Sequence, residues 1–281
     1  MKNRIVNLLL AAAFLAGLSL LLYPTVSDYW NSLHASKAVA AYDQEVRQLD
    51  QGRYDALLDA AREYNRTLLD RSSGYYLTDD QKARYDSLLN VDGGGIMGYI
   101  EIPTIKLSLP IYHGTEEDVL QIAVGHLDWS SLPVGGESTH CVLSGHRGLP
   151  SAKLFTNLDQ LVEGDAFVIR TLDEVLTYEV DQFLIVEPDD VSALSIEEGK
   201  DLCTLVTCTP YGVNSHRLLV RGHRVANQSE AIRVTSDAIQ IEPLLVAPVL
   251  AIPMLLALLF LLLIPGRKKR PTGGNEHEKT E

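Results

Sequence analysis

Two long apolar stretches lie near the ends of the chain, at residues 5–23 and 244–264. About twenty consecutive apolar residues cross the core of a bilayer, so each stretch predicts a transmembrane helix. Two basic residues within 1–4 precede the first stretch, and the run Arg-Lys-Lys-Arg at 267–270 follows the second. Positive charge stays on the cytoplasmic side, so both termini (1–4 and 265–281) are expected in the cytoplasm and the rest outside the cell.

A cleaved signal peptide is the alternative interpretation of residues 5–23. The stretch is long for the apolar part of a signal peptide, and it does not end in the small-x-small pattern of a cleavage site. We therefore expect an uncleaved membrane anchor at this position.

Helical spacing of apolar residues marks the extracellular segment 24–92. Two stripes recur at three- and four-residue intervals: Val39, Tyr42, Val46 and Leu49, then Tyr54, Leu57, Leu58, Ala61 and Tyr64. Gly52 is expected at the break between the two helices. Thr78 and Gln81 have the spacing of a capping box, which predicts a third, short helix ending near Leu89. These stripes are expected to pack against a neighbouring domain.

The pattern changes to that of strands after the glycine run at 93–95, which we take as the start of a domain at 93–226. Apolar or alternating runs recur at 96–102, 105–111, 141–144, 166–170, 176–186, 202–207 and 217–221. Short helices are expected near 118–124 and 151–158. Seven or eight short strands predict a mainly β domain, either a closed barrel or a sandwich. A polar linker at 227–243 connects this domain to the second apolar stretch.

The formal net charge of −13 argues against a nucleic-acid partner, which needs a basic surface. Three cysteines cannot all pair within one chain, so a disulfide framework does not organise the fold. Cys141 and Cys203 each precede a candidate site residue by five positions, and this odd offset places them on the opposite face of a strand, in the core. A bond between them stays open but is not favoured. The spacings typical of zinc ligands do not occur, so neither a metal nor a cofactor is predicted.

The candidate chemistry lies at the ends of predicted strands. Cys208 ends the run Thr-Leu-Val-Thr-Cys, a Pro-Tyr-Gly turn follows, and Arg217 begins the next strand. His146 lies between two glycines further upstream. A thiol, an imidazole and a fixed cation are what acyl transfer through a covalent intermediate requires. The alternative is that Cys208 is an ordinary buried core residue.

Four further histidines compete with His146 for the role of proton donor and acceptor: His113, His126, His140 and His216. A histidine performs proton transfer only beside a positioned partner. We therefore expect these four to be structural or surface residues.

Residues 204–208 together with Arg217 resemble the signature of sortases, the membrane-bound cysteine transpeptidases of Gram-positive bacteria. Residues 207–217 and the motif Leu-Ser-Gly-His-Arg-Gly-Leu-Pro at 143–150 are similar to class C, the pilin-polymerising sortases. The resemblance covers about residues 96–224, favours the closed barrel over the sandwich, and implies an enzyme at the cell membrane with an extracellular catalytic domain.

The resemblance also implies a reaction. Cys208 attacks an LPxTG-type sorting signal between Thr and Gly, Arg217 stabilises the oxyanion, and His146 protonates the leaving amine. The thioacyl group then passes to a pilin lysine. Thr207, beside the nucleophile, is expected either to contact substrate or to be an ordinary strand residue.

Class C sortases often carry a lid with an Asp-Pro-aromatic motif in the segment before the barrel. The sequence between residues 70 and 78 has no such triplet. Tyr75 and Tyr76 are the candidate lid residues, and the alternative is that both are exposed loop tyrosines.

Three functions therefore stay open: a pilin-polymerising sortase; a sortase that attaches proteins to the cell wall, or a hydrolytic thiol peptidase; and a non-catalytic, membrane-anchored pilus assembly or binding protein. Sortase substrates also end in an apolar helix and basic residues, but they carry an LPxTG-like pentapeptide before that helix. This chain has none there, which favours the enzyme over its substrate.

Overall fold

The computed structural model describes residues 2–69, 76–91, 93–227 and 255–256. The described residues between 23 and 227 form one compact unit, and residues 2–22 belong to another. Helix α1 (Lys2–Arg47) includes the predicted anchor and the first part of the segment expected outside the cell, and it contains Pro24. Among the described residues, α1 alone is long and apolar enough to cross a membrane. The predicted second span lies almost wholly outside the described residues and stays a prediction.

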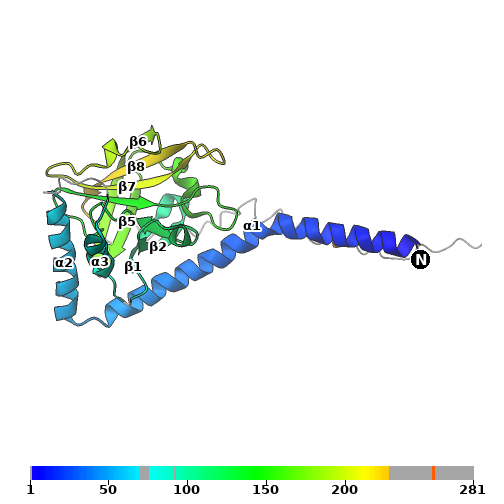
Figure 1. The fold of residues 1–281 in the computed structure, drawn as a ribbon, viewed down its shortest axis with the longest axis horizontal. Helices are drawn as coiled ribbons and strands as arrows, with labels where there is room; N and C mark the ends of the chain where they lie inside the picture. Colours follow the sequence, from blue (N-terminus) through cyan, green and yellow to red (C-terminus); the bar gives the residue numbers. More distant parts are fainter. Residues whose placement is uncertain (1, 70–75, 92, 228–254, 257–281) are drawn as a thin grey trace, which may run out of the picture. The chain divides into compact units, whose positions relative to one another are not determined.

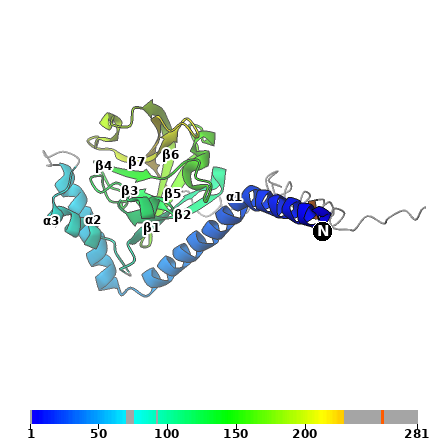
Figure 2. The same ribbon diagram turned by 45° about the vertical axis from the view of Figure 1, so that its right-hand side comes forward.

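Eight strands close into a barrel, as the resemblance implied (Figures 1 and 2). Around the barrel their order is β1-β2-β3-β4-β7-β8-β6-β5. The strands are β1 (Ile96–Ile102), β2 (Leu107–His113), β3 (Val124–His126), β4 (Thr139–Ser144), β5 (Ala166–Thr171), β6 (Glu174–Val186), β7 (Asp201–Thr209) and β8 (His216–Val225). Strand β4 pairs in parallel with β7, and β7 pairs antiparallel with β8.

Several boundaries differ from the sequence-based expectation. Strand β2 begins at Leu107, because the 3-10 turn η1 (Pro103–Ile105) ends on Lys106 in the left-handed conformation (φ 51°). Strand β3 was not predicted, since a segment of three residues is too short to show alternation. The expected short helices are α4 (Glu117–Leu120) and the 3-10 segment η2 (Leu154–Gln160), and a further 3-10 turn, η3 (Ser192–Leu194), lies between β6 and β7.

Helices α2 (Gln51–Leu69) and α3 (Asp79–Ser87) lie beside the barrel (Figures 1 and 2). The capping box of α3 is confirmed: the Thr78 side chain accepts from the Gln81 backbone, and the Gln81 side chain accepts from the Thr78 backbone. The expected break at Gly52 is wrong, because α2 already begins at Gln51. The Asp50 carboxylate accepts a hydrogen bond from the Arg53 amide at 2.9 Å and so caps α2 before the glycine.

Buried polar contacts join the helices to the barrel. Tyr42 of α1 donates to the Met97 carbonyl at 3.0 Å and accepts from the Leu172 amide at 2.8 Å. Asn65 of α2 makes two hydrogen bonds with the backbone of Leu132, at 3.1 and 2.8 Å. These side chains replace water at backbone groups that would otherwise be buried without a partner.

The prediction that Cys141 and Cys203 lie in the core is confirmed. Cys141 of β4 and Cys203 of β7 are 3% and 0% exposed, and they are direct partners in the parallel ladder. All three cysteines are free thiols, and Cys208 is half-buried.

Candidate active site

Cys208 and Arg217 are directly opposite each other on β7 and β8. Directly opposed residues in an antiparallel pair share one face of the sheet, with Cα atoms about 4.5–5.5 Å apart. The Arg217 Nη1 atom donates to the carbonyls of Asn214 and His216, at 3.4 and 3.2 Å, within the turn that joins the two strands. The turn therefore holds the guanidinium at the strand end that carries the thiol.

His146 follows the end of β4, the parallel neighbour of β7. The last pair in this ladder is Ser144 with Val206, and the Gly145 amide extends it by donating to the Val206 carbonyl at 3.1 Å. Continuing this register brings His146 level with Cys208. A side chain at Gly145 would approach the Phe155 ring to 2.8 Å, so glycine is required where the loop packs closely.

The residues on either side of Cys208 bind the residues on either side of His146. Thr207 donates its hydroxyl hydrogen to the Gly145 carbonyl at 2.7 Å. Arg147 donates through Nη1 to the Thr209 hydroxyl at 3.3 Å and forms an ion pair with Asp159. Two hydrogen bonds therefore tie the histidine loop to the strand end that carries the cysteine.

Thr207 is 2% exposed, and its hydroxyl is engaged by the histidine loop. Because side chains alternate between the two faces of a strand, Thr207 points to the inner face of β7 and Cys208 to the outer face. This position favours the interpretation of Thr207 as an ordinary strand residue over the interpretation that it contacts substrate.

The sequence did not point to Glu117 or Arg147. The Glu117 Oε2 atom lies 3.7 Å from Nε2 of His146, while Oε1 accepts a hydrogen bond from Gln121 at 2.6 Å. Glu117 begins the four-residue helix α4, and nothing in its local sequence connects it to a histidine 29 positions later. Arg147 adjoins a candidate residue, but its partners Asp159 and Thr209 become neighbours only in the folded barrel.

A cleft of about 220 Å³ opens beside Arg217. We call it the cysteine-side cleft, and it is lined by Thr115, Leu120, Leu127, Ser144, Val186, Pro188, Asp190, Val191, Leu194, Val206, Arg217 and Leu219. Val206 lies two residues before Cys208 and therefore on the same face of β7. The lining is mostly aliphatic, so the cleft suits an apolar segment of a peptide next to the thiol.

The four competing histidines all have other partners. His126 is fully buried and contacts the Tyr85 hydroxyl at 2.9 Å, and His113 contacts the carbonyls of Gly95 and Leu88. His140 contacts the Ser195 carbonyl and the Thr204 hydroxyl, and His216 lies 3.3 Å from the Glu187 carboxylate. Burial lowers the pKa of His113 and of His140, which keeps both rings neutral.

The candidate lid residues fall at the edge of the described chain. Tyr75 lies outside the described residues. Tyr76 is 91% exposed. Whether either residue covers the cleft stays a prediction.

Comparison with known proteins agrees with this geometry. Residues 100–225 match the family model of the sortase domain. Sortase D of Bacillus subtilis is 33% identical over 157 residues, which are 55% of this chain and 76% of that protein.

Two solved structures are more similar in sequence. Sortase C1 from Streptococcus agalactiae is 51% identical, with a TM-score of 0.67 over 68% of this chain and 100% of that one. Clostridium perfringens sortase C, solved with the C-terminal cell wall sorting motif, is 42% identical, with a TM-score of 0.61 over 68% of this chain and 100% of that one.

Proposed function

This chain belongs to the sortase family of cysteine transpeptidases, and we propose that it cleaves an LPxTG-type sorting signal between Thr and Gly and joins the acyl group to a pilin lysine. The similarity to solved class C sortases, one of them from a pilus island and another analysed for its pilin substrate specificity, supports the pilin as partner. One structural observation carries the proposal: Cys208 and Arg217 face each other across β7 and β8, and the His146 loop is tied to the same strand end.

In the proposed reaction, the Cys208 thiolate attacks the carbonyl carbon of the threonine in the sorting signal. The oxyanion that forms is stabilised by Arg217, whose guanidinium stays charged at every working pH and presents a planar set of donors. His146 gives its proton to the departing glycine amine, and the C–N bond breaks to leave a thioacyl enzyme. His146 then takes a proton from the incoming lysine amine, which attacks the thioester and releases Cys208.

The cysteine-side cleft supports the choice of acyl donor. Its aliphatic lining, which includes Leu127, Val191, Leu194 and Val206, offers an apolar surface to the Leu-Pro portion of the signal. This portion precedes the cleaved bond, so the acyl side of the substrate extends from Cys208 toward Leu194.

The apolar start of α1 supports a location at the membrane. Pilin precursors with sorting signals are anchored in the same membrane, so enzyme and substrate meet at high effective concentration. A second membrane span at 244–264 and a cytoplasmic C-terminus belong to the same proposal.

The test uses the full chain purified in detergent and an LPxTG peptide, followed by mass spectrometry. We expect a thioacyl adduct on Cys208 that transfers to a lysine-containing pilin peptide, and no adduct on the Cys208→Ala variant. Transfer only to a cell-wall stem-peptide amine would identify a wall-attaching sortase. Transfer only to water would identify a hydrolytic peptidase.

A further inference from the structure

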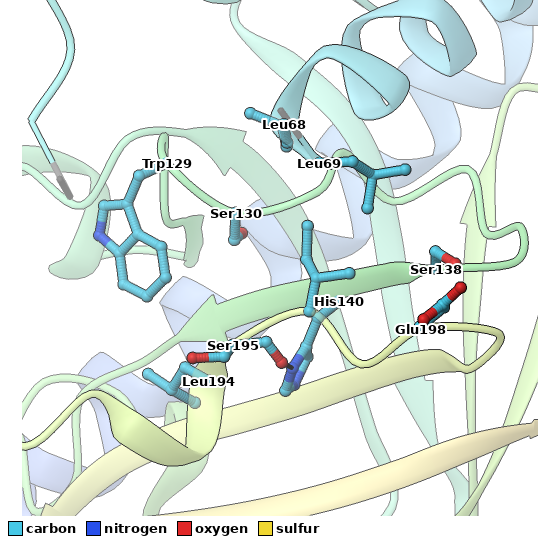
Figure 3. A pocket seen from close by; sticks show the side chains of 10 residues that line it. Leu68, Leu69, Trp129, Ser130, Ser138, His140, Leu194, Ser195 and Glu198 are labelled. Carbon is cyan, nitrogen blue, oxygen red and sulfur yellow. Dashed lines mark hydrogen bonds between the residues drawn. The ribbon is translucent and has the colours of Figure 1, made fainter. Parts of the chain in front are cut away.

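A second cavity, of about 640 Å³, lies on the same face of the barrel as the cysteine-side cleft. We call it the upstream pocket, and it is lined by Leu68, Leu69, Trp129, Ser130, Ser138, His140, Leu194, Ser195, Ile196 and Glu198. Figure 3 shows Leu68 and Leu69 at the end of α2 on one side, and Leu194 and Ser195 on the other. Trp129 lies at one end of the cavity, and Ser138 and Glu198 lie at the other.

The two cavities are parts of one surface. Leu194 lines both of them. It is also 5% exposed and belongs to a single apolar cluster with Trp129 of the upstream pocket and Leu127, Val191 and Val206 of the cysteine-side cleft. The two cavities therefore adjoin at Leu194, on the side toward which the acyl donor is proposed to extend.

Strand register gives the spacing between the thiol and the upstream pocket. His140 on β4 pairs with Leu202 on β7, which lies six residues before Cys208. At about 3.3 Å per residue, the separation along the strand is ~20 Å. An extended peptide has the same rise, so the pocket meets side chains six residues upstream of the threonine attached to Cys208. In LPxTG the leucine is three residues upstream of that threonine. The side chains that meet the upstream pocket therefore lie about three positions before the leucine.

The chemistry of the pocket favours an apolar side chain. Leu68, Leu69, Trp129, Leu194 and Ile196 supply its walls. Three of its polar side chains are already engaged within the protein. Ser130 donates to the Leu127 carbonyl at 2.8 Å, Ser138 accepts from the Gly199 amide at 2.9 Å, and His140 bonds both Ser195 and Thr204.

The walls of the pocket are held in place before any ligand arrives. Between β6 and β7, the Ser195 carbonyl contacts Nδ1 of His140 at 2.9 Å, and the Glu197 carboxylate accepts from Arg221 at 3.0 Å. On the other side, Tyr64 of α2 donates to the Asp128 carbonyl at 3.2 Å. A preformed site loses little entropy when it binds.

We propose that the upstream pocket binds an apolar side chain of the acyl donor two or three residues before the leucine of its sorting signal. This inference rests on the proposed function, because that function sets the direction of the peptide. The pocket extends recognition beyond the pentapeptide, so that the enzyme distinguishes its own substrate from other proteins with the same signal.

The experiment compares a minimal LPxTG peptide with longer peptides that carry leucine, phenylalanine or aspartate three residues before the signal. Fluorescence anisotropy with the full-length Cys208→Ala variant measures binding without turnover, and thioacylation of the unmodified enzyme is followed in parallel. Burial of one apolar side chain predicts roughly tenfold tighter binding for the leucine and phenylalanine peptides than for the aspartate peptide.

The Leu69→Asp variant tests whether the preference among the peptides arises at the upstream pocket. Leu69 is the last residue of α2 and is 52% exposed, so the barrel is expected to tolerate the change. The variant should lose the preference for leucine and phenylalanine while binding the minimal peptide as before. Val162→Asp is the matched control, because Val162 is similarly exposed, at 61%, and lies outside both cavities.

Two results would overturn the inference: equal binding of all the longer peptides, or a preference that survives Leu69→Asp. In either case, thioacylation of Cys208 by the minimal peptide would leave the proposed function intact. Conversely, absence of a thioacyl adduct with every peptide would overturn the proposed function, even if the anisotropy measurement showed a preference at the upstream pocket.

Discussion

The hydroxyl of Thr207 donates a hydrogen bond to the carbonyl of Gly145, and so joins the residue before Cys208 to the residue before His146. A second bond, from Arg147 to Thr209, joins the residues that follow them. The relative position of thiol and imidazole is therefore fixed by their neighbours on both sides.

Replacing Thr207 by valine keeps the shape of the side chain but leaves the buried Gly145 carbonyl without its donor. An unpaired buried group costs about 1–3 kcal/mol, so we expect a lower melting temperature. We also expect a lower rate of thioacylation at saturating peptide, with little change in KM, because the histidine loop loses a tie to β7. Thr207→Ser should restore both quantities. A normal rate in Thr207→Val would remove the positioning role.

Arg217→Lys keeps the positive charge but loses the planar set of donors. By analogy with the loss of one oxyanion donor in other acyl-transfer enzymes, thioacylation should slow by ~10²-fold or more. Arg62→Lys is the control, since the Arg62 side chain is 43% exposed and pairs with Glu174, which is far from the thiol in the sequence of the barrel. Stopped-flow release of the glycine-containing product gives both rates, and equal rates would exclude Arg217 from the oxyanion role.

Glu117→Gln removes the carboxylate 3.7 Å from Nε2 of His146. A carboxylate at this distance helps to orient the imidazole of His146, and the proposed proton transfer to the leaving amine depends on that orientation. We expect thioacylation to slow several-fold, because a partly exposed contact of this kind contributes only modestly. Asp118→Asn on the same helix is the control. An unchanged rate, or an equal effect of the control, would contradict the assignment.

Alkylation should distinguish the three cysteines. Cys141 and Cys203 are 3% and 0% exposed, whereas Cys208 is half-buried. Brief treatment of the folded protein with iodoacetamide should therefore modify Cys208 alone, and treatment in denaturant should modify all three thiols. Peptide mapping by mass spectrometry measures the sites. Modification of Cys141 or Cys203 at the same rate as Cys208 would show that the barrel opens.

The stability of the barrel should decrease as the pH falls below neutrality. Burial lowers the pKa of His140 in the folded state, and the charge of Arg221 acts in the same direction. The unfolded chain, with a histidine pKa of about 6.5, then takes up the proton first as the pH falls. His140 therefore makes its full contribution to the free energy of unfolding above the pKa of the unfolded chain, and this contribution is lost as the pH falls below it.

Thermal unfolding between pH 7.5 and 5 measures this effect. His140→Gln should show a shallower fall in melting temperature over this range than the unmodified protein, because one titrating group is gone. His113, whose pKa burial also lowers, accounts for part of the remaining slope. If the melting temperatures of the two proteins fell equally with pH, His140 would not contribute to the pH dependence of stability.

Local patterns predicted the elements that depend on local forces. The capping box at Thr78 marks the start of α3, and the two-residue period of strands correctly places Cys141 and Cys203 in the core. The same period, with the family signature, brought Cys208 and Arg217 to one strand end.

Features made by distant segments could not be predicted in this way. The upstream pocket requires the end of α2, the start of β4 and the loop around Leu194, and Leu69 and Leu194 at its two sides are 125 residues apart in sequence. Glu117 reaches His146 only because parallel pairing of β2 with β3, and antiparallel pairing of β3 with β4, brings the start of α4 to the end of β4. Neither arrangement leaves a periodic signal in the sequence.

The parallel pairing of β4 with β7 also determines when the site can exist during biosynthesis. The ends of these strands carry His146 and Cys208, and the intervening chain, with β5 and β6, must turn back before the two strands can lie side by side. Such non-local pairings form late in folding, because the loop must close first. In a newly made, unfolded chain the thiol of Cys208 is therefore not yet beside the imidazole of His146, and the two come together only when the barrel closes.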